Sequence, residues 1–514
     1  MKKLGGLCAA LAVALLAADG ASARTLCVSK NNKNCFRTIQ EGIHFAQFGD
    51  TVRIEPGVYT DTMQIPPLKQ GLRIVGTKAV VVDAIFDGCL QDQPNDQHDP
   101  NPNANSCKVN NLDINKPQFP AAVVLNGAPG IHIYAHDVQI RGITIRGGVS
   151  HGILVQNGRQ RVRIIDVAIE GPAATGILCG GTCDDLVISD VTITGAQTGV
   201  SVSGPRVVVD RVLVDGTTTG AGVVVNGVDA FVDRPEVLGV AGAGVQVTGD
   251  RASVIRADVD GATGLGVNVT GNQAWVAGNR TANTVGGVRV TGDAPIVEKN
   301  RVSSSTGSAA GIRVVCATCA SGSVGRNRVE DVTGTGNGIE LVASAAGLVA
   351  ERNRVDRVAG AGVDLTGSTG AVVARNAVRD AGTTTEPCFR VAAASSLVER
   401  NKVQRCAGEG FIVTGAGNVL ARNAAKDAGT DGFEVGPAAS GTTLERNTAQ
   451  SSQLYGFEVA DGGTPATTTT LDRNRGTRSA LFDLCDEGVA TTLSNNRFGS
   501  EAPVVQDGVR DCVQ

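Results

Sequence analysis

Residues 287–355 contain the repeated phrase that decides the fold. The stretch reads GVRVTG (287–292), IVEKNRV (296–302), GIRVVC (311–316), SVGRNRV (323–329), GIELVA (338–343) and LVAERNRV (348–355). One half-phrase is a Gly followed by alternating apolar residues, and the other ends in Asn, any residue and Val. Alternation with a period of two, interrupted by Gly and Asn, predicts short strands separated by turns. Because the pair of half-phrases returns at a fixed interval, the sequence predicts a solenoid.

The interval between the Gly-led phrases is about 23 residues, which suits one coil of a parallel β-helix. Paired helices and propeller blades need longer repeats. Gly and β-branched residues dominate, and no apolar stripe with a helical period persists, so a helical solenoid is excluded. The phrase begins at Gly152, Gly176, Gly199, Gly222, Gly244, Gly266, Gly287, Gly311, Gly338, Gly362, Cys388, Gly410, Gly432, Gly456 and Ala480.

The Asn of the second half-phrase recurs at the same interval. A residue that returns once per coil lies directly above its predecessor, about 4.8 Å away. Stacked Asn amides can therefore hydrogen-bond along the axis, while Asn also tolerates the left-handed backbone of a tight turn. In the earlier coils we expect Asp166, Asp190 and Asp210 to replace the Asn. The predicted ladder comprises Asn279, Asn300, Asn327, Asn353, Asn376, Asn401, Asn423, Asn447 and Asn474.

The first 23 residues have the features of a secretory signal peptide. Lys2 and Lys3 give a basic start, residues 7–16 an apolar middle, and residues 21–23 (ASA) a small-residue cleavage site. The apolar run is too short to span a bilayer, which argues against a membrane anchor. We therefore expect a mature chain without a transmembrane segment that is exported to the periplasm or the extracellular medium.

Twelve cysteines follow this signal, and they occur as close neighbours. An even number in an exported chain favours disulfides. A metal site shared by residues 179/183 and 316/319 is excluded, because about six coils separate these pairs by roughly 28 Å whereas zinc–sulfur bonds are about 2.3 Å long. The sequence leaves the connectivity open, and pairing of neighbours predicts Cys27–Cys35, Cys89–Cys107, Cys179–Cys183, Cys316–Cys319, Cys388–Cys406 and Cys485–Cys512.

The composition limits the classes of partner. The net charge is −4, which gives no sign of nucleic-acid binding. Aromatic residues make up only 3% of the chain, with Trp275 as the single Trp. Sugar-binding clefts usually rely on aromatic platforms, so the low aromatic content argues against high affinity for a polysaccharide.

Residues 37–48, RTIQEGIHFAQF, carry the one helical pattern. Ile39, Ile43 and Phe45 form its apolar stripe, and Gly49 with Asp50 ends it. A solenoid needs a cover over its first coil, which otherwise exposes unpaired strand edges and the apolar interior. We interpret this helix as the N-terminal cap.

The repeat is lost between Ala84 and Pro120, where Asn, Asp and Pro dominate. A loop of this length is usually functional or disordered, and a Cys89–Cys107 bond favours order. The predicted division is a signal peptide at 1–23, a cap with the first coil at 24–60, a β-helix at 61–479 with a polar insertion at 84–120, and a C-terminal cap at 480–514.

The segments TIQEGIHFAQFGD (38–50), TVRIEPGVYTD (51–61) and LRIVG (72–76) resemble the start of many exported β-helix proteins. The repeats at 131–148 and 151–171 extend the likeness through much of the chain. The sequence is thus similar to the pectate-lyase-like superfamily, including its carbohydrate-binding and sugar-hydrolase repeat group. The resemblance implies an all-β fold, a single-stranded right-handed parallel β-helix, and the general rule for parallel crossovers gives the same handedness.

Polysaccharide lyases and hydrolases on this fold work on the outer wall of the coils, so the resemblance directs attention to the coils beside the insertion. Uronate β-elimination needs a base for the carbon-bound proton and a cation for the developing enolate. His136 and His151 are the candidates for the base and Arg146 for the cation. The alternative is that they are outward-facing turn residues.

Calcium is the only cofactor that the sequence suggests. Asp92, Asp96 and Asp99 lie close together within the insertion, and calcium prefers oxygen ligands; solvated loop carboxylates are the alternative. Asp184 and Asp185 resemble the paired acids of polygalacturonases, but the Asn-Thr-Asp and Gly-His-Gly motifs of that family are absent. Pectin methylesterase and pectate lyase signatures are also missing, so no family activity is carried over to a residue here.

A basic residue precedes each Asn of the ladder in eight consecutive coils. Stacked charges add their fields, so this column is a candidate binding site for an anionic polymer, with Arg352, Arg375, Arg400 and Arg422 at its centre. Acidic residues beside it would partly neutralise it, and long basic side chains also cover apolar surface. The column comprises Lys299, Arg326, Arg352, Arg375, Arg400, Arg422, Arg446 and Arg473.

Two hypotheses for function follow. The first is a monomeric exported protein that binds an acidic polysaccharide or cell-surface glycan without turning it over. The second is a polysaccharide lyase or hydrolase that acts on uronate-containing polymers, with its site beside residues 84–120. The basic column and the missing catalytic signatures favour the first.

Overall fold

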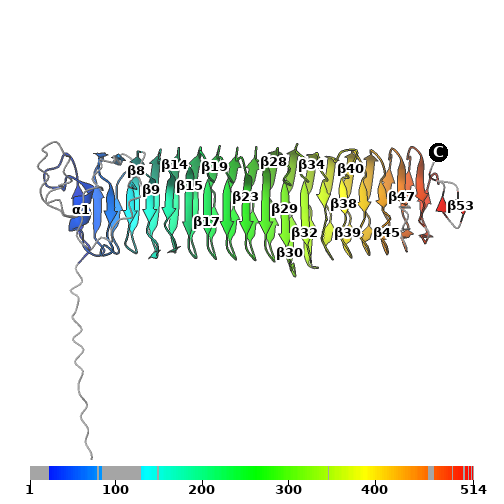
Figure 1. The fold of residues 1–514 in the computed structure, drawn as a ribbon, viewed down its shortest axis with the longest axis horizontal. Helices are drawn as coiled ribbons and strands as arrows, with labels where there is room; N and C mark the ends of the chain where they lie inside the picture. The colour runs from blue at the N-terminus through cyan, green and yellow to red at the C-terminus, as the bar shows by residue number, and fades with distance from the viewer. Residues whose placement is uncertain are drawn as a thin grey trace, which may run out of the picture.

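The computed structural model describes residues 22–77, 80–83, 129–147, 150–344, 346–460, 468–488, 490–501, 504–506, 509–510 and 512. These residues form one long stack of coils (Figure 1). Each coil has three walls, numbered 1 to 3 in chain order. Corner 1 joins walls 1 and 2, corner 2 joins walls 2 and 3, and corner 3 leads to the next coil. All strand pairs between coils are parallel and in register, so the predicted parallel β-helix is confirmed.

Wall 1 is formed by the Gly-led half-phrase. Each strand pairs with the strand one coil away, from β4 paired with β7 to β47 paired with β50. The wall consists of β4(Met63–Ile65), β7(Ile131–Ile133), β9(His151–Val155), β12(Thr175–Cys179), β15(Thr198–Ser203), β17(Val223–Asn226), β20(Val245–Thr248), β23(Leu265–Thr270), β26(Gly286–Thr291), β29(Ile312–Cys316), β32(Ile339–Ala343), β35(Val363–Asp364), β38(Phe389–Val391), β41(Phe411–Val413), β44(Phe433–Val435), β47(Tyr455–Val459) and β50(Phe482–Asp486).

Wall 2 precedes corner 2. In four early coils a single long strand continues from wall 2 into wall 3. The wall consists of β1(Thr25–Val28), β2(Thr51–Ile54), β5(Arg73–Val75), the first halves of β8(Gln139–Arg146), β11(Arg163–Glu170), β14(Val187–Thr194) and β16(Val208–Asp215), and then β18(Phe231–Asp233), β21(Ser253–Ile255), β24(Trp275–Ala277), β27(Ile296–Glu298), β30(Gly322–Gly325), β33(Leu348–Glu351), β36(Val372–Ala374), β39(Leu397–Glu399), β42(Val419–Ala421), β45(Thr443–Glu445), β48(Thr470–Asp472) and β51(Thr492–Ser494).

Wall 3 follows corner 2 and completes each coil. Small pairs stand outside the walls, β10(Arg159–Gln160) with β13(Cys183–Asp184) and, antiparallel, β53(Val504–Gln506) with β54(Val509–Arg510). Besides the second halves of the four long strands, wall 3 consists of β3(Gly57–Tyr59), β6(Val80–Asp83), β19(Glu236–Leu238), β22(Asp258–Asp260), β25(Arg280–Ala282), β28(Arg301–Ser305), β31(Arg328–Val332), β34(Arg354–Val358), β37(Ala377–Ala381), β40(Lys402–Cys406), β43(Ala424–Ala428), β46(Thr448–Gln450), β49(Arg475–Thr477) and β52(Arg497–Phe498).

The recurring Gly at the start of wall 1 is required by close packing. A Cβ on Gly244 would lie 2.3 Å from the Val259 side chain inside the coil and 2.6 Å from the carbonyl oxygen of Gly266 in the next coil. The same two obstructions recur at Gly222 and Gly362. Since real Cβ atoms do not approach other atoms so closely, the Gly column is what lets wall 1 lie against the Val and Ile side chains of wall 3.

The predicted Asn ladder is confirmed. In each step an Asn amide nitrogen donates to the amide oxygen of the Asn in the next coil and to a wall 2 carbonyl of the preceding coil. Asn353 Nδ2 donates to Asn376 Oδ1 at 2.9 Å and to the carbonyl of Val324 at 2.9 Å. The predicted members are at most 2% exposed, and the ladder continues to Asn496. Buried amides are thus fully hydrogen-bonded, as burial requires.

The predicted replacement of Asn by Asp in the earlier coils is wrong. Asp166 and Asp190 occupy the position before the ladder column, in the left-handed conformation with φ of 56°. Asp210 lies one residue earlier still, in β16. In these coils the ladder position is filled by buried Val, as at Val212. An Asp could not serve there, because a buried carboxylate has no N–H to donate to the next amide.

The left-handed turn residue is likewise not the Asn. It is the residue before the Asn, and Arg, Lys or Asp usually occupies it in spite of the steric cost of a Cβ there. Corners 1 and 3 have similar columns of non-Gly residues with positive φ, such as Asp137, Arg161 and Asp185 at corner 1 and Asp331 and Arg357 at corner 3. The sequence pattern did not predict these two columns.

The helix α1(Ile39–Phe45) is shorter than the predicted span of 37–48. Thr38 caps its first turn by accepting the backbone N–H of Glu41 at 3.1 Å. Ile39 and Ile43 are fully buried, and α1 lies at the N-terminal end of the stack (Figure 1). No helix in the described part of the chain is long and apolar enough to cross a membrane.

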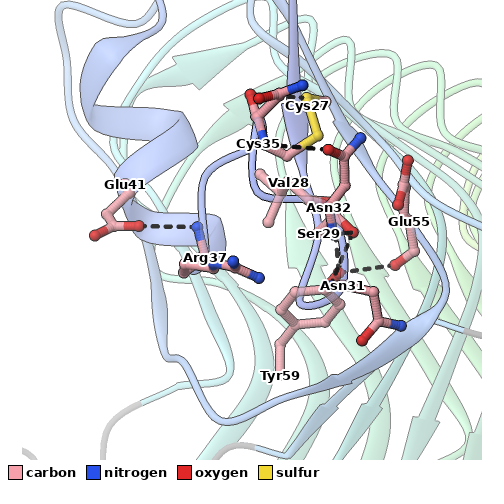
Figure 2. The surroundings of a disulfide bond; sticks show 11 residues. Cys27, Val28, Ser29, Asn31, Asn32, Cys35, Arg37, Glu41, Glu55 and Tyr59 are labelled. Carbon is pink, nitrogen blue, oxygen red and sulfur yellow. Dashed lines mark hydrogen bonds between the residues drawn. A yellow bond between two sulfur atoms is a disulfide. The ribbon is translucent and has the colours of Figure 1, made fainter.

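Five disulfides are present among the described residues. Figure 2 shows the first with its surroundings, which include Tyr59; the Tyr59 hydroxyl donates to the carbonyl of Glu55 at 2.9 Å. The predicted pair Cys89–Cys107 lies outside the described residues. The bonds join Cys27–Cys35, Cys179–Cys183, Cys316–Cys319, Cys388–Cys406 and Cys485–Cys512, as pairing of neighbours predicts.

The repeat extends further than the sequence predicts at its C-terminal end. Strands β50, β51 and β52 continue walls 1, 2 and 3 in register beyond residue 480.

The signal peptide and the insertion lie outside the described residues, except for residues 22 and 23.

Replacing Asn353 by Ala should destabilise the solenoid. The substitution leaves the buried backbone and amide N–H groups of Asn327 without their acceptor and removes the amide donor to the carbonyl of Val324, and each unsatisfied group costs about 1–3 kcal/mol. We expect a clearly lower urea midpoint, measured by circular dichroism. Asn226→Ala, at an exposed position of wall 1, is the control. Equal midpoints for the two variants would contradict the structural role of the ladder.

Candidate functional site

Corner 2 carries the predicted column of eight cations, here called the basic ridge. All eight have left-handed backbone with φ between 55° and 58°, and all are exposed. The backbone N–H of each donates to a carbonyl of the next coil, for example from Arg352 to Ala374 at 3.2 Å. The side chains therefore leave the solenoid once per coil, in register. The ridge comprises Lys299, Arg326, Arg352, Arg375, Arg400, Arg422, Arg446 and Arg473.

Acidic residues of wall 2 accompany the ridge and partly neutralise it. Five ridge residues directly follow a Glu or Asp, and the ion pairs are loose, from 3.1 Å for Arg446 with Glu445 to 4.0 Å for Arg473 with Glu445. Exposed pairs of this kind contribute about 0–1 kcal/mol. Arg326 and Arg422, which follow Gly325 and Ala421, form no ion pair with the described residues, whereas Arg375, which follows Ala374, pairs with Glu351 of the preceding coil at 3.5 Å.

The surface around the ridge has an excess of positive charge. From β27 to β43, the strands of walls 2 and 3 and the corner residues between them contain 14 basic and 8 acidic residues, a net charge of 14 − 8 = +6. The whole chain has a net charge of −4. Walls 2 and 3 therefore carry an excess of positive charge on these coils, although the chain as a whole is acidic.

The structure places the three predicted catalytic residues on two different corners. Arg146 ends β8 at corner 3 and forms an ion pair with Glu170 at 2.7 Å. His151 begins β9, on the other side of the same corner. His136 lies at corner 1, on the opposite edge of wall 1, where its Nδ1 accepts the backbone N–H of Gln160 at 3.2 Å. Arg146 and His151 are therefore neighbours in the fold, and His136 is apart from them.

The imidazole of His151 is partly buried at the edge of wall 1. Its Nδ1 has no hydrogen-bond partner among the described residues, and burial lowers the pKa of the ring. His132, on β7, lies against Tyr134 and 3.1 Å from the side-chain oxygen of Gln156; burial lowers its pKa to about 4. Both rings are thus neutral at pH 7, the protonation state of a general base.

Wall 1 also carries an acidic cluster that sequence reasoning missed. It consists of Asp431, Glu434 and Glu458, whose carboxylate oxygens lie within 4.8 Å of one another. Asp431 precedes β44 and is 4% exposed, and its Oδ1 accepts the backbone N–H of Tyr455 at 2.8 Å. The available signal was the repeated GFEV at 432–435 and 456–459, which stacks two outward Glu side chains.

Burial and mutual repulsion keep this cluster protonated at pH values where isolated carboxyls are ionised. Burial, reinforced by the charges of Glu458 and Glu409, raises the pKa of Glu434 to about 7. Burial also raises the pKa of Asp431 and of Glu458, which share a hydrogen bond. Such groups can exchange protons near pH 7, and ionised they offer the oxygen ligands that a hard cation prefers.

The predicted calcium ligands Asp92, Asp96 and Asp99 lie outside the described residues. In the chain, residues 84–120 fall between β6 of wall 3 and β7 of wall 1, that is, at corner 3. This is the corner that Arg146 and His151 flank one coil later.

Residues 221–378 match the family model described as the right handed beta helix region. This part of the chain is a right-handed β-helix. The match covers coils from β17 to β37 and includes the first half of the basic ridge. It confirms the fold that the sequence resemblance implied. No match was found among the curated proteins.

Several solved structures are similar to the chain at low sequence identity. A pectin methylesterase bound to a hexasaccharide is 12% identical, with a TM-score of 0.31, and the alignment covers 50% of this chain and 89% of the other. The periplasmic alginate epimerase AlgG (a D317A mutant) is 12% identical, with a TM-score of 0.30 and coverage of 66% and 77%. The A-module of the Azotobacter vinelandii mannuronan C-5 epimerase AlgE6 is 14% identical, with a TM-score of 0.24 and coverage of 90% and 94%.

The acidic cluster should make stability fall as the pH rises. Raised pKa values mean that the folded chain holds protons which the unfolded chain releases, so unfolding becomes easier from about pH 4.5 up to about pH 8. For Glu434 alone the effect amounts to at most about 3 kcal/mol. We expect a lower melting temperature at pH 8 than at pH 5, measured by calorimetry. Asp431→Asn/Glu458→Gln should flatten this dependence, and Glu351→Gln/Glu399→Gln should not.

Proposed function

We propose that this β-helix is an exported protein that binds an acidic polysaccharide or cell-surface glycan along the basic ridge, without turning it over. The observation that supports the proposal is the stacking of eight exposed cations in register. Their spacing of about 4.8 Å places them within one Debye length of each other at physiological ionic strength, about 8 Å. Their fields therefore add along the ridge, which a linear polyanion can follow over its whole length.

The distribution of acids supports binding from the wall 3 side. The Glu and Asp partners of the ridge belong to wall 2, whereas the first outward position of wall 3 is again basic at Arg301, Arg328 and Arg354. Two of these arginines converge on Glu330 and the third on Asp356, both of which are almost fully buried. The two carboxylates hold the three arginines in place and balance only part of their charge.

Neutralising three ridge residues should weaken polyanion binding. In Arg352→Gln/Arg375→Gln/Arg400→Gln the left-handed turns are retained, because Gln273 adopts the same conformation at corner 1. If each contact contributes about 0.5–1 kcal/mol, affinity for polygalacturonate should fall about tenfold or more. Binding is measured by retention of the mature protein on immobilised polymer at increasing salt.

The control is Arg251→Gln/Arg357→Gln/Arg405→Gln. It removes the same charge from the same kind of turn, but these arginines form close pairs with Asp229, Asp331 and Asp380 on corners 1 and 3. Its elution should stay close to that of the unaltered protein. Equal loss in both variants would mean that net charge alone, and not the ridge, determines retention.

Turnover of a uronate polymer beside the insertion is the second candidate function. It is favoured by His151, a neutral imidazole without a hydrogen-bond partner among the described residues, next to Arg146 across corner 3. In this scheme His151 or His136 removes the proton and Arg146 stabilises the enolate. Calcium held by Asp92, Asp96 and Asp99 would assist by binding the uronate carboxylates.

The triple variant His136→Ala/His151→Ala/Arg146→Ala tests this second function. If these residues act, the variant should lose at least about a hundredfold in rate, since general acid–base catalysis contributes about 10²–10⁴-fold. The assay follows the ultraviolet absorbance of unsaturated uronate together with new reducing ends, with and without calcium. His44→Ala, on α1, is the matched control. Unchanged turnover in the triple variant would remove these residues from consideration.

Residues 1–23 would direct export and be removed, which agrees with the disulfides. The helix α1 would cover the N-terminal end of the stack, where its buried Ile39 and Ile43 pack against the first coils. The mature protein would act as a monomer.

A further inference from the structure

A hollow of about 650 Å³ lies on the outer surface near the N-terminal end, between wall 2 and corner 1. It is distinct from the basic ridge, which begins at Lys299 and follows corner 2. The volume falls within the range of about 300–1,000 Å³ that small-molecule sites occupy. Six of the residues that line the hollow carry the argument: Arg73, Asp137, Gln139, Arg161, Arg163 and Arg206.

The floor of the hollow is the outward surface of wall 2. Arg73, Gln139 and Arg163 occupy one column, in register on three successive coils. Their neighbours along the strands, Ile74 and Ile164, are fully buried, so the alternation of the strands turns the polar side chains outward. Arg73 and Arg163 are therefore two coils apart, about 9.6 Å, with the amide of Gln139 between them.

A second outward column widens this positive surface. Arg53 and Arg141 lie two residues further along wall 2, on alternate coils. Together with Arg73 and Arg163 they form a zigzag of four exposed arginines, with neighbours about 8 Å apart. No outward position of wall 2 on these four coils, from β2 to the first half of β11, carries an acid.

None of these four arginines forms an ion pair or a side-chain hydrogen bond with the described residues. The arginines of corner 1 differ, because Arg161 pairs with Asp137 at 2.5 Å and Arg206 pairs with Asp185 at 2.6 Å. The rim of the hollow is thus neutral and held in place, whereas its floor presents free guanidinium groups. Most ridge residues, by contrast, have an acidic partner.

The arrangement costs stability in the free protein. Like charges on neighbouring strands repel one another, and no acid of wall 2 relieves the repulsion here. A bound anion would relieve it. A guanidinium group suits this task, because it binds carboxylate, sulfate or phosphate through two parallel hydrogen bonds.

We propose that the hollow is a binding site for a small ligand that bears two acidic groups. Arg73 and Arg163 each bind one group, and the amide of Gln139 hydrogen-bonds to the ligand between them. Arg53 and Arg141 raise the local concentration of anions through their field. The shared chemistry is that of a dianion, which an acidic oligosaccharide or a polyphosphate supplies.

Calorimetric titration of the mature full-length protein with trigalacturonate and, separately, with pyrophosphate tests the site. The protein should bind at least one probe at one site per chain. Arg73→Gln/Arg163→Gln should weaken that binding at least tenfold, and Arg251→Gln/Arg405→Gln, which changes two paired arginines at corners 1 and 3, should leave it within twofold. The probe that binds more tightly identifies the sugar or the phosphate as the source. Absence of binding by both probes overturns the proposal, as does tenfold loss in both variants.

Thermal unfolding separates loss of the site from loss of the fold. Because Arg73→Gln/Arg163→Gln removes repulsion, its melting temperature should equal or exceed that of the unaltered protein. Gln139→Leu retains all four cations and should weaken binding several-fold. Binding within twofold of the unaltered protein in Arg73→Gln/Arg163→Gln would overturn the proposal. The ridge variants test polysaccharide retention separately, so either idea can fail alone.

Discussion

Alignment of each residue with its counterpart one coil away is the constraint on which the rest of this structure depends. Parallel strands of adjacent coils pair in register on all three walls. Each side chain therefore lies directly above the residue at the equivalent position of the preceding coil. Two columns maintain this alignment, one at the start of wall 1 and the other at corner 2. The Gly column lets wall 1 approach wall 3, and the Asn ladder links successive corners through buried amides. A single Gly or Asn has no such effect, because each member of a column contacts the equivalent residue of the adjacent coil.

The same constraint explains how charge is ordered on the surface. Each corner needs a residue with left-handed backbone, which an L-residue adopts at a cost of about 1–2 kcal/mol. Because this residue lies at the same position of every coil, the charged side chains at a corner form a regular column. Corners 1 and 3 often alternate Asp with Arg, as at Asp229 and Arg251, and so form neutral pairs between coils. Corner 2 repeats the cation in every coil from Lys299 to Arg473, and this difference creates the ridge.

Periodic features could be predicted from the sequence because a repeat averages over many coils. The coil length, the Asn ladder, the neighbouring disulfides and the basic column all recur or lie close together in the chain. Asp166 and Asp190 were predicted as ladder residues but lie one position earlier, in the turn. A shift of one residue exchanges a buried position for a turn position. Chain spacing alone does not reveal that shift.

The candidate sites could be predicted less well, because they depend on differences between coils. Glu434 and Glu458 look like ordinary strand residues until burial raises their pKa values. The hollow at Arg73 and Arg163 brings together residues separated by the insertion, which the sequence pattern treats as a break. His136 and His151 are close in sequence, but the coil carries them to opposite edges of wall 1.

The amides of the ladder all point the same way. From Asn279 to Asn474, each Nδ2 donates towards the C-terminal neighbour and each Oδ1 accepts from the N-terminal side. Any coil between them therefore presents the same acceptor at one face and the same donor at the other. Duplication or loss of a whole coil rejoins the ladder without a fault, whereas an inverted or partial coil does not. Such a solenoid can change its length during evolution only in complete units, and with it the number of cations on the ridge.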